Sequence, residues 1–306
     1  MNSSLAHFTI AINSRHEFDR ILNSPAETLL LQVNGFGLHQ QLVFSEDQVQ
    51  QALDQIHASG KLAAINLLSL LEENQVTEAE AFLKRWKDQA DLFYVSDDGW
   101  LQYAKKYDCL ERFVMFPETL IASDQDSQFY LDLGVKRTGL MPGLSLEELL
   151  HDGWNRDQSE IMISGRIPWM VSRRPLLSNY LSYTGQPEKF EQDAIYTLKE
   201  KKRQEPLPMV QHERMSVIYG PKPLQSFDQI NDLFKAGYSH FLINSLFEEW
   251  HWSEKVLDAY RTFLDNPDSS EWTEEIRQLK EEGDDSSYFQ KSALTKKEAK
   301  KMEAGN

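Results

Sequence analysis

The sequence predicts an α/β fold, a (β/α)8 TIM-like barrel with a β-hairpin insertion between strands 7 and 8 and a polar C-terminal tail. Three observations favour it. Short apolar runs of β type alternate with amphipathic helical stretches along most of the chain. Most of these runs are continuously apolar, as expected for parallel strands that are covered on both faces. Eight runs match the strand number of a closed barrel, with an open doubly wound sheet as the alternative.

The predicted strands are residues 8–12, 28–33, 62–68, 92–95, 112–116, 135–141, 160–164 and 240–244. The helices between them carry start signals in which Ser or Thr precedes Glu or Gln by three residues, at Ser45, Thr77, Ser145 and Ser226. Glycine readily takes the left-handed backbone that ends a helix, and the expected ends are at Gly60, Gly134, Gly153 and Gly237. This repetition is typical of βα units in a parallel sheet.

One interval, residues 166–239, is far longer than the other connections. It contains two β-type runs, 194–198 and 209–219, and predicts an insertion at about 183–222 within a barrel domain of residues 1–267. An insertion after a strand lies on the C-terminal face of a barrel, where active sites are built. Residues 268–306 are predicted as a charged C-terminal helix and tail, because 271–285 hold seven acidic and two basic side chains.

Composition narrows the function classes. The 306 residues carry 32 basic and 48 acidic side chains, and the net charge of −16 disfavours broad nucleic-acid binding through a basic face. The N-terminus lacks the regions of a signal peptide, and no apolar run approaches membrane-spanning length. The single cysteine, Cys109, excludes an internal disulfide and a metal site of several thiolates. We therefore expect a cytoplasmic protein without membrane contact.

The segment 160–180 is the strongest candidate for binding. A β run ends at Gly165, and Arg166, Arg173 and Arg174 follow in a stretch predicted to be irregular and stiffened by Pro168 and Pro175. Guanidinium groups held at a strand end suit a carboxylate or phosphate. The alternative is that these arginines pair with carboxylates of this acidic chain.

If the barrel is correct, polar residues gather at the carboxyl ends of its strands and predict a hydrophilic pocket. They are Asn13, Asn34, Asn66, Asp97, Asp98, Glu118, Arg166 and Asn244. In this prediction the arginines, with Asn34, Asn66 and Asn244, bind a ligand, although asparagine also caps and turns after strands for structural reasons. Glu118 and Asp98 are the only candidates for acid and base, on the condition that they face each other. No metal site is predicted.

Several motifs resemble one known family. Leu177-Ser178-Asn179-Tyr180 after the glycine-ended strand, Ser123-Asp124-Gln125-Asp126, and Leu144-Ser145-Leu146-Glu147-Glu148 are similar to motifs of the collagenase-like peptidase family U32. The resemblance covers about residues 123–180 clearly and implies a (β/α)8-like barrel, in agreement with the strand count. It also implies one of two activities. Some members are described as peptidases, and others hydroxylate RNA or a quinone precursor with a cysteine-bound iron–sulfur cluster and prephenate as hydroxyl donor.

The sequence departs from that pattern at the cysteines. The two signature cysteines of the family fall on Pro168 and Pro175, which have no ligand atom, and a later pair is absent. We therefore expect no cofactor on this chain. The first hypothesis is an auxiliary subunit of prephenate-dependent 5-hydroxylation of the tRNA wobble uridine, beside a longer cysteine-bearing paralogue and meeting tRNA only through that complex. The alternatives are a collagenase-like peptidase or hydrolase, and a non-catalytic barrel that binds a carboxylate such as a prephenate-like dicarboxylate.

Overall fold

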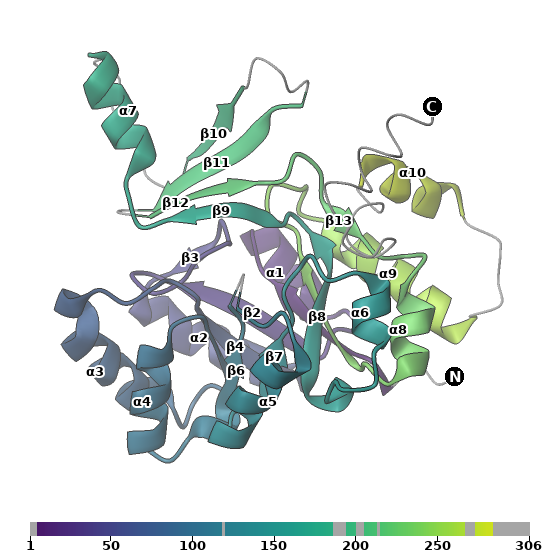
Figure 1. Cartoon of the computed structure of the whole chain (residues 1–306), viewed down its shortest axis with the longest axis horizontal. Coiled ribbons are helices and arrows are strands. Elements are labelled where there is room, and N and C mark those ends of the chain that lie inside the picture. The colour runs from purple at the N-terminus through teal and green to yellow at the C-terminus, as the bar shows by residue number, and fades with distance from the viewer. Residues whose placement is uncertain are drawn as a thin grey trace.

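Eight parallel strands form a closed ring in the computed structural model, which describes residues 5–117, 120–185, 194–199, 205–212, 215–266 and 273–283 (Figure 1). The ring closes because β1 pairs with β2 on one side and with β14 on the other. This confirms the predicted barrel and excludes the open sheet. In ring order the strands are β1 (His7–Ala11), β2 (Thr28–Val33), β4 (Leu62–Leu67), β5 (Leu92–Val95), β6 (Phe113–Met115), β7 (Arg137–Gly139), β8 (Ser159–Gly165) and β14 (His240–Asn244).

Helices surround this ring. Between the strands lie α1 (Arg15–Ile21), α2 (Glu46–Ala58), α3 (Val76–Trp86), α4 (Asp98–Lys106), α5 (Asp124–Leu133), α6 (Leu146–Leu150) and α8 (Ile230–Ala236), and α9 (Trp252–Asp265) follows β14. Two short strands extend the sheet, β3 (Val43–Phe44) beside β2 and β13 (Leu224–Gln225) beside β8. Every residue of β2 and of β8 is buried, as expected for strands with helices outside and packed side chains inside.

Two of the four predicted helix starts are confirmed and two are wrong. Ser45 and Ser145 form the capping boxes predicted for α2 and α6. Thr77 does not begin a helix, because α3 starts one residue earlier and the capping box belongs to the preceding turn, Glu72 with Gln75. Ser226 also fails as a cap, since α8 begins after Gln229. Both failures lie where a turn of other geometry precedes the helix, which a spacing rule does not register.

The insertion is a four-stranded antiparallel sheet, larger than the predicted hairpin. Its order is β10 (Ile195–Leu198), β11 (Leu207–His212), β12 (Met215–Tyr219) and β9 (Pro168–Ser172). The prediction that the segment after Arg166 is irregular is therefore wrong in part. This segment forms β9 and then helix α7 (Leu176–Thr184). Figure 1 shows the sheet lying across one end of the barrel, with α7 projecting away from it.

Apolar side chains of the insertion close the barrel. Val210, Met215, Val217 and Tyr219 belong to the same buried cluster as the inward-facing residues of the barrel strands. A separate cluster fills the space between the strands and the outer helices. The insertion thus covers the carboxyl ends of the strands. Because active sites of barrels lie at these ends, a binding site is expected beneath or beside the insertion.

The described part of the C-terminal region is helix α10 (Glu274–Glu282), which contacts α9. Its glutamate side chains are exposed, while Ile276 and Leu279 are buried. The lysine-rich stretch 291–301 and the cluster Lys201–Arg203 lie outside the described residues. Within the described ranges, no helix has both the length and the apolar character needed to cross a membrane.

Candidate functional site

The asparagines at the strand ends hold a protein loop. Asn66 donates to the carbonyl oxygen of Leu38 and to Gln40 Oε1, each at 2.7 Å. Asn244 donates to the carbonyl oxygen of His39 at 3.0 Å and accepts a hydrogen bond from Asn13 at 2.9 Å. These amides are buried, and their groups are used to fold the loop after β2 into the barrel mouth. Asn66 and Asn244 were predicted to bind a ligand. Their hydrogen bonds to the loop instead fit the structural role that asparagine often has after a strand.

Gly37, near the start of that loop, also serves the packing of the loop itself. A Cβ added at Gly37 would lie 2.2 Å from the side chain of Gln32 and 3.1 Å from the carbonyl oxygen of Asn66. The close approach that glycine permits here is to the protein itself. Asn34, at the beginning of the loop, is exposed.

Of the two acid–base candidates, Asp98 lies in the described part of the chain and Glu118 does not, so their pairing stays a prediction. Asp97 caps α4 through a hydrogen bond from the Gly99 N–H at 2.7 Å. Asp98 is exposed and interacts with Tyr130 of α5, where burial first, and then the Asp98 charge and hydrogen bond, raise the pKa of Tyr130 to about 12. Asp98 therefore lies between two outer helices. Glu118 falls outside the described residues.

The three arginines go to different places. Arg166 forms an ion pair with Glu248, with Nη2–Oε1 at 2.8 Å and Nε–Oε1 at 3.0 Å, and also donates to the carbonyl oxygens of Gly220 and Pro221. Burial raises the pKa of Glu248, and Arg166 opposes that rise. Arg166 thus ties the exit of β8 to the loop after β14. Arg173 and Arg174 are exposed, and neither forms an ion pair within the described part of the chain.

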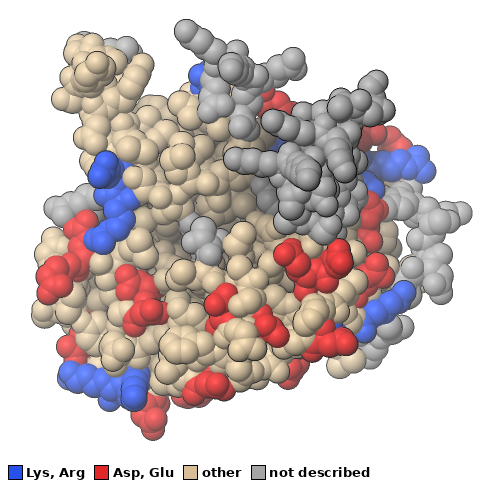
Figure 2. All heavy atoms as spheres, viewed as in Figure 1, with Lys and Arg blue, Asp and Glu red and all other residues tan. Residues whose placement is uncertain are grey.

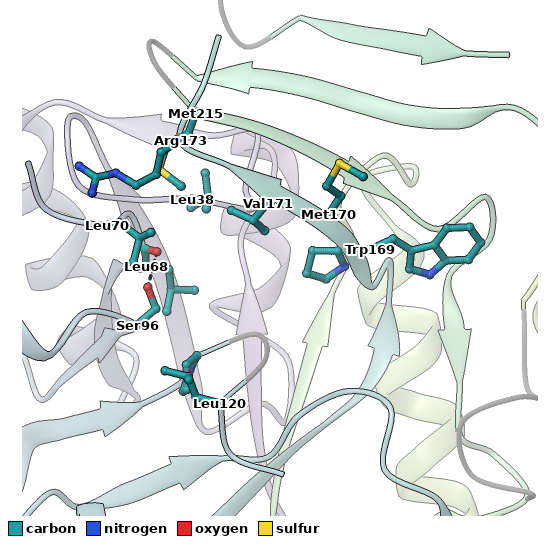
Figure 3. A pocket seen from close by; sticks show the side chains of 12 residues that line it. Leu38, Leu68, Leu70, Ser96, Leu120, Trp169, Met170, Val171, Arg173 and Met215 are labelled. Carbon is teal, nitrogen blue, oxygen red and sulfur yellow. Dashed lines mark hydrogen bonds between the residues drawn. The ribbon is translucent and has the colours of Figure 1, made fainter. Parts of the chain in front are cut away.

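A cavity of about 270 Å³ lies at the barrel mouth, under β9 of the insertion (Figure 3). Its wall is mainly apolar and comes from the loop after β2, the ends of β4 and β6, and the insertion: Leu38, Leu68, Leu70, Pro117, Leu120, Pro168, Val171 and Met215. Ser96 is also in the wall, and its hydroxyl donates to the Leu68 carbonyl oxygen at 2.7 Å. Among the residues that the structure describes, Arg173 is the one charged residue that lines this cavity. Figure 3 shows its guanidinium at the same end as Leu68 and Leu70.

Of the predicted ligand-binding residues, Arg173 alone lines this cavity. The apolar wall was missed because its members come from distant parts of the chain and resemble ordinary core residues. One local signal was available: Val171 and Arg173 alternate with Met170 and Ser172, and period two predicts that the first pair shares a face of a strand. That signal was hidden by the two prolines, which favoured an irregular loop.

A second hollow lies between the N-termini of α5 and α6. Its polar lining includes Ser123, Ser145, Glu148 and His151. Ser145 and Glu148 cap α6, and Ser123 caps α5, so these groups already serve the helices. In the part of the chain that the structure describes, no group of three or more His, Cys, Asp or Glu is arranged to hold a metal ion.

An ion pair that the sequence did not predict is buried inside the barrel. Glu160 is fully buried and accepts a hydrogen bond from Arg137 Nε at 3.1 Å. The Tyr94 hydroxyl lies 2.8 and 2.9 Å from the two Glu160 oxygens, and 3.1 Å from the Thr9 hydroxyl. Nearby, burial first and then the Arg137 charge lower the pKa of His240 to about 3, so that this imidazole is neutral at physiological pH.

Cys109 is remote from the mouth. It lies between α4 and β6, at the end of the barrel where strands begin, and is 4% exposed within the outer apolar cluster. Burial raises the pKa of its thiol, which makes the thiolate scarce at neutral pH.

Comparison with known proteins gives matches over most of the chain. The sequence profile of peptidase family U32 matches residues 13–299. A curated relative, tRNA hydroxylation protein P2 of Bacillus subtilis (strain 168), is 21% identical over 250 residues, which are 80% of this chain and 81% of the relative. The solved U32 peptidase Mk0906 is 14% identical with a TM-score of 0.47, covering 78% of this chain and 92% of that one. A xylose isomerase domain-containing protein from Salmonella typhimurium is 13% identical with a TM-score of 0.48, covering 87% and 100%.

Proposed function

Because the chain belongs to peptidase family U32, we propose that it acts in hydroxylation of the tRNA wobble uridine as an auxiliary subunit. The observation that carries this proposal is the match with tRNA hydroxylation protein P2, which extends over four fifths of both chains. The cytoplasm is the compartment that suits this role.

The cysteine content supports an auxiliary role. An iron–sulfur cluster of the family type needs four thiolates, and this chain has one cysteine, buried at the opposite end of the barrel from the mouth. Pro168, at one signature position, lines the apolar cavity instead. We therefore assign the cluster, and the consumption of prephenate as hydroxyl donor, to a longer cysteine-bearing U32 partner.

The net charge supports indirect contact with tRNA. At −16 the chain as a whole repels a polyanion, and Figure 2 shows acidic side chains spread over the visible face of the barrel. A complex in which the partner supplies the basic surface avoids this repulsion. The proposal thus places tRNA against the partner.

Deletion of the gene tests the role directly. We expect the hydroxylated wobble uridine to disappear from tRNA, measured by mass spectrometry of nucleosides, and to return when the wild-type gene is restored. The tagged protein should co-purify with the longer cysteine-bearing U32 relative. An unchanged level of the modified uridine in the deletion strain would contradict the proposal.

Helix α7 offers the surface for this partner. Its nine residues include no charged side chain, although a quarter of the whole chain is charged. Tyr183 is 90% exposed and Tyr180 is 57% exposed. The helix projects from the body (Figure 1) and is drawn in tan, the colour of uncharged residues, in Figure 2. The base of the helix is anchored, because the Leu176 and Leu177 N–H groups donate to Ser216 and Gln211. Exposed tyrosines on a fixed support are typical of interface hot spots.

We therefore expect Tyr180→Ser with Tyr183→Ser to weaken co-purification of the partner by about tenfold or more. The measurement is the ratio of partner to tagged protein after affinity purification. The matched control is Phe129→Ser, which removes another exposed aromatic ring, on α5. Equal retention of the partner by the double variant and the control would assign the interface elsewhere.

A second candidate function, carboxylate binding without chemistry, is favoured by one observation: Arg173 lines the cavity and lacks an ion pair within the described residues. This function is compatible with an auxiliary role. The peptidase alternative receives no comparable support, since Asp98 contacts Tyr130 on the outside of the barrel. Calorimetry with Arg173→Ala tests the second candidate, and loss of carboxylate binding is the expected result.

A further inference from the structure

The cavity beneath the insertion combines an apolar interior with one cation at its edge, counted over the described part of the chain. Leu38 and Leu68 come from the barrel side, while Val171 and Met215 come from the insertion above. Arg173 supplies the charge. A ligand that fills this space therefore has an apolar body and a single anionic group.

A second anionic group on the ligand would find no further cation among the described residues of the wall. The Arg166 guanidinium is bound to Glu248 and to two backbone carbonyl oxygens, so a ligand would have to displace all three. Arg174 does not line the cavity, although it is adjacent to Arg173 in the chain. A dicarboxylate would consequently place one carboxylate against apolar wall, which is costly without a hydrogen-bond donor.

The hydrogen-bonding groups of the wall also exclude a nucleobase. Ser96 donates its hydroxyl proton to the Leu68 carbonyl oxygen, and the neighbouring Ser69 hydroxyl donates to the Met215 sulfur at 3.3 Å. A base edge presents several donors and acceptors that a protein must match. The described part of the lining has no set of free polar groups of that kind, whereas an apolar ring needs none.

Size sets a further limit. The volume of about 270 Å³ lies below the range of roughly 300–1,000 Å³ that holds drug-sized ligands. A single ring with a short side chain is the scale that fits.

We propose that this cavity binds a small monocarboxylate with one apolar ring. The carboxylate lies against the Arg173 guanidinium, and the ring lies between Val171 and Met215 on one side and Leu38 and Leu68 on the other. The proposal rests on the second candidate function and narrows it from carboxylates in general to those with one charge. It does not depend on the role in tRNA hydroxylation.

Three compounds that share the 3-phenylpropanoyl skeleton test it on the full-length protein: hydrocinnamate with one charge, hydrocinnamamide with none, and phenylsuccinate, which carries an added carboxylate, with two. We expect calorimetry to rank hydrocinnamate first, with the amide and the dicarboxylate each weaker by about fivefold or more. Methionine-methyl NMR locates the site, because Met215 lines the cavity and Met215→Leu identifies its signal. Hydrocinnamate should shift that signal.

Two exposed neighbours provide a matched pair of variants. Arg173→Gln should weaken hydrocinnamate binding to the level of the amide, while Arg174→Gln should leave it unchanged, because only Arg173 lines the cavity. Leu120→Asp is a second variant at an exposed wall position, 55% exposed, and should weaken binding by placing a negative charge there.

The results that would overturn the proposal are distinct. If phenylsuccinate binds more tightly than hydrocinnamate and Arg174→Gln weakens it, carboxylate binding stands and the single-charge inference falls. If no compound shifts the Met215 signal, both fall. Equal affinity of wild type and Arg173→Gln for hydrocinnamate would also refute it.

Discussion

Arg137→Met is expected to lower the free energy of unfolding by about 3–5 kcal/mol, because it leaves a carboxylate buried without a counter-ion. Glu160 is fully buried inside the barrel, and the Arg137 side chain is 6% exposed. Tyr94 supplies a hydrogen bond but no positive charge. Urea unfolding followed by tryptophan fluorescence measures the loss, since Trp86 and Trp100 are buried in the outer core.

Two comparisons isolate the cause. The double variant Arg137→Met with Glu160→Met removes both charges and should be clearly more stable than Arg137→Met alone, because no ion remains to be desolvated. Arg20→Met removes an exposed arginine, 57% exposed, from its pair with Glu254, and should cost less than about 1 kcal/mol. Equal costs for Arg137→Met and Arg20→Met would show that burial of the inner pair has no energetic consequence.

Gly165→Ala is expected to destabilise the protein by about 3 kcal/mol, the sum of backbone strain and a steric clash. Gly165 has φ of +134°, where L-residues are rarely found, and an added Cβ would lie 2.4 Å from the Asn244 carbonyl oxygen. The residue pairs with Asn244 in β14 and with Leu224 in β13, so the neighbouring backbone is held from two sides. Thermal and urea unfolding measure the effect.

The control for this variant is Gly185→Ala at the end of α7. Gly185 also has positive φ, +65°, but an added Cβ there meets no atom of the described residues within 4 Å. It should therefore show the strain alone, about 1 kcal/mol. If both variants lose the same stability, the close approach at Gly165 is relieved by a small shift, and the strand exit toward β9 is less constrained than the geometry indicates.

The fold was largely determined by local patterns in the sequence. Three of the eight barrel strands, β2, β5 and β14, have the predicted bounds to the residue, and the other five differ at their ends. Apolar runs, capping serines and the left-handed glycines Gly60, Gly134 and Gly237 act within a few residues, so their meaning survives without knowledge of the rest of the chain. The resemblance to family U32 likewise followed from short motifs.

The content of the site was decided only by tertiary structure. Asparagines at strand ends were visible in the sequence, but the loop that consumes their hydrogen bonds lies up to 205 residues away, as in Asn244 with His39. Arg166 was visible too, whereas its partner Glu248 follows 82 residues later. Arg137 and Glu160 resemble ordinary charged residues of strands until the ring closes around them. A side chain's chemistry depends on its neighbours in space, and barrel closure brings together residues that no local pattern connects.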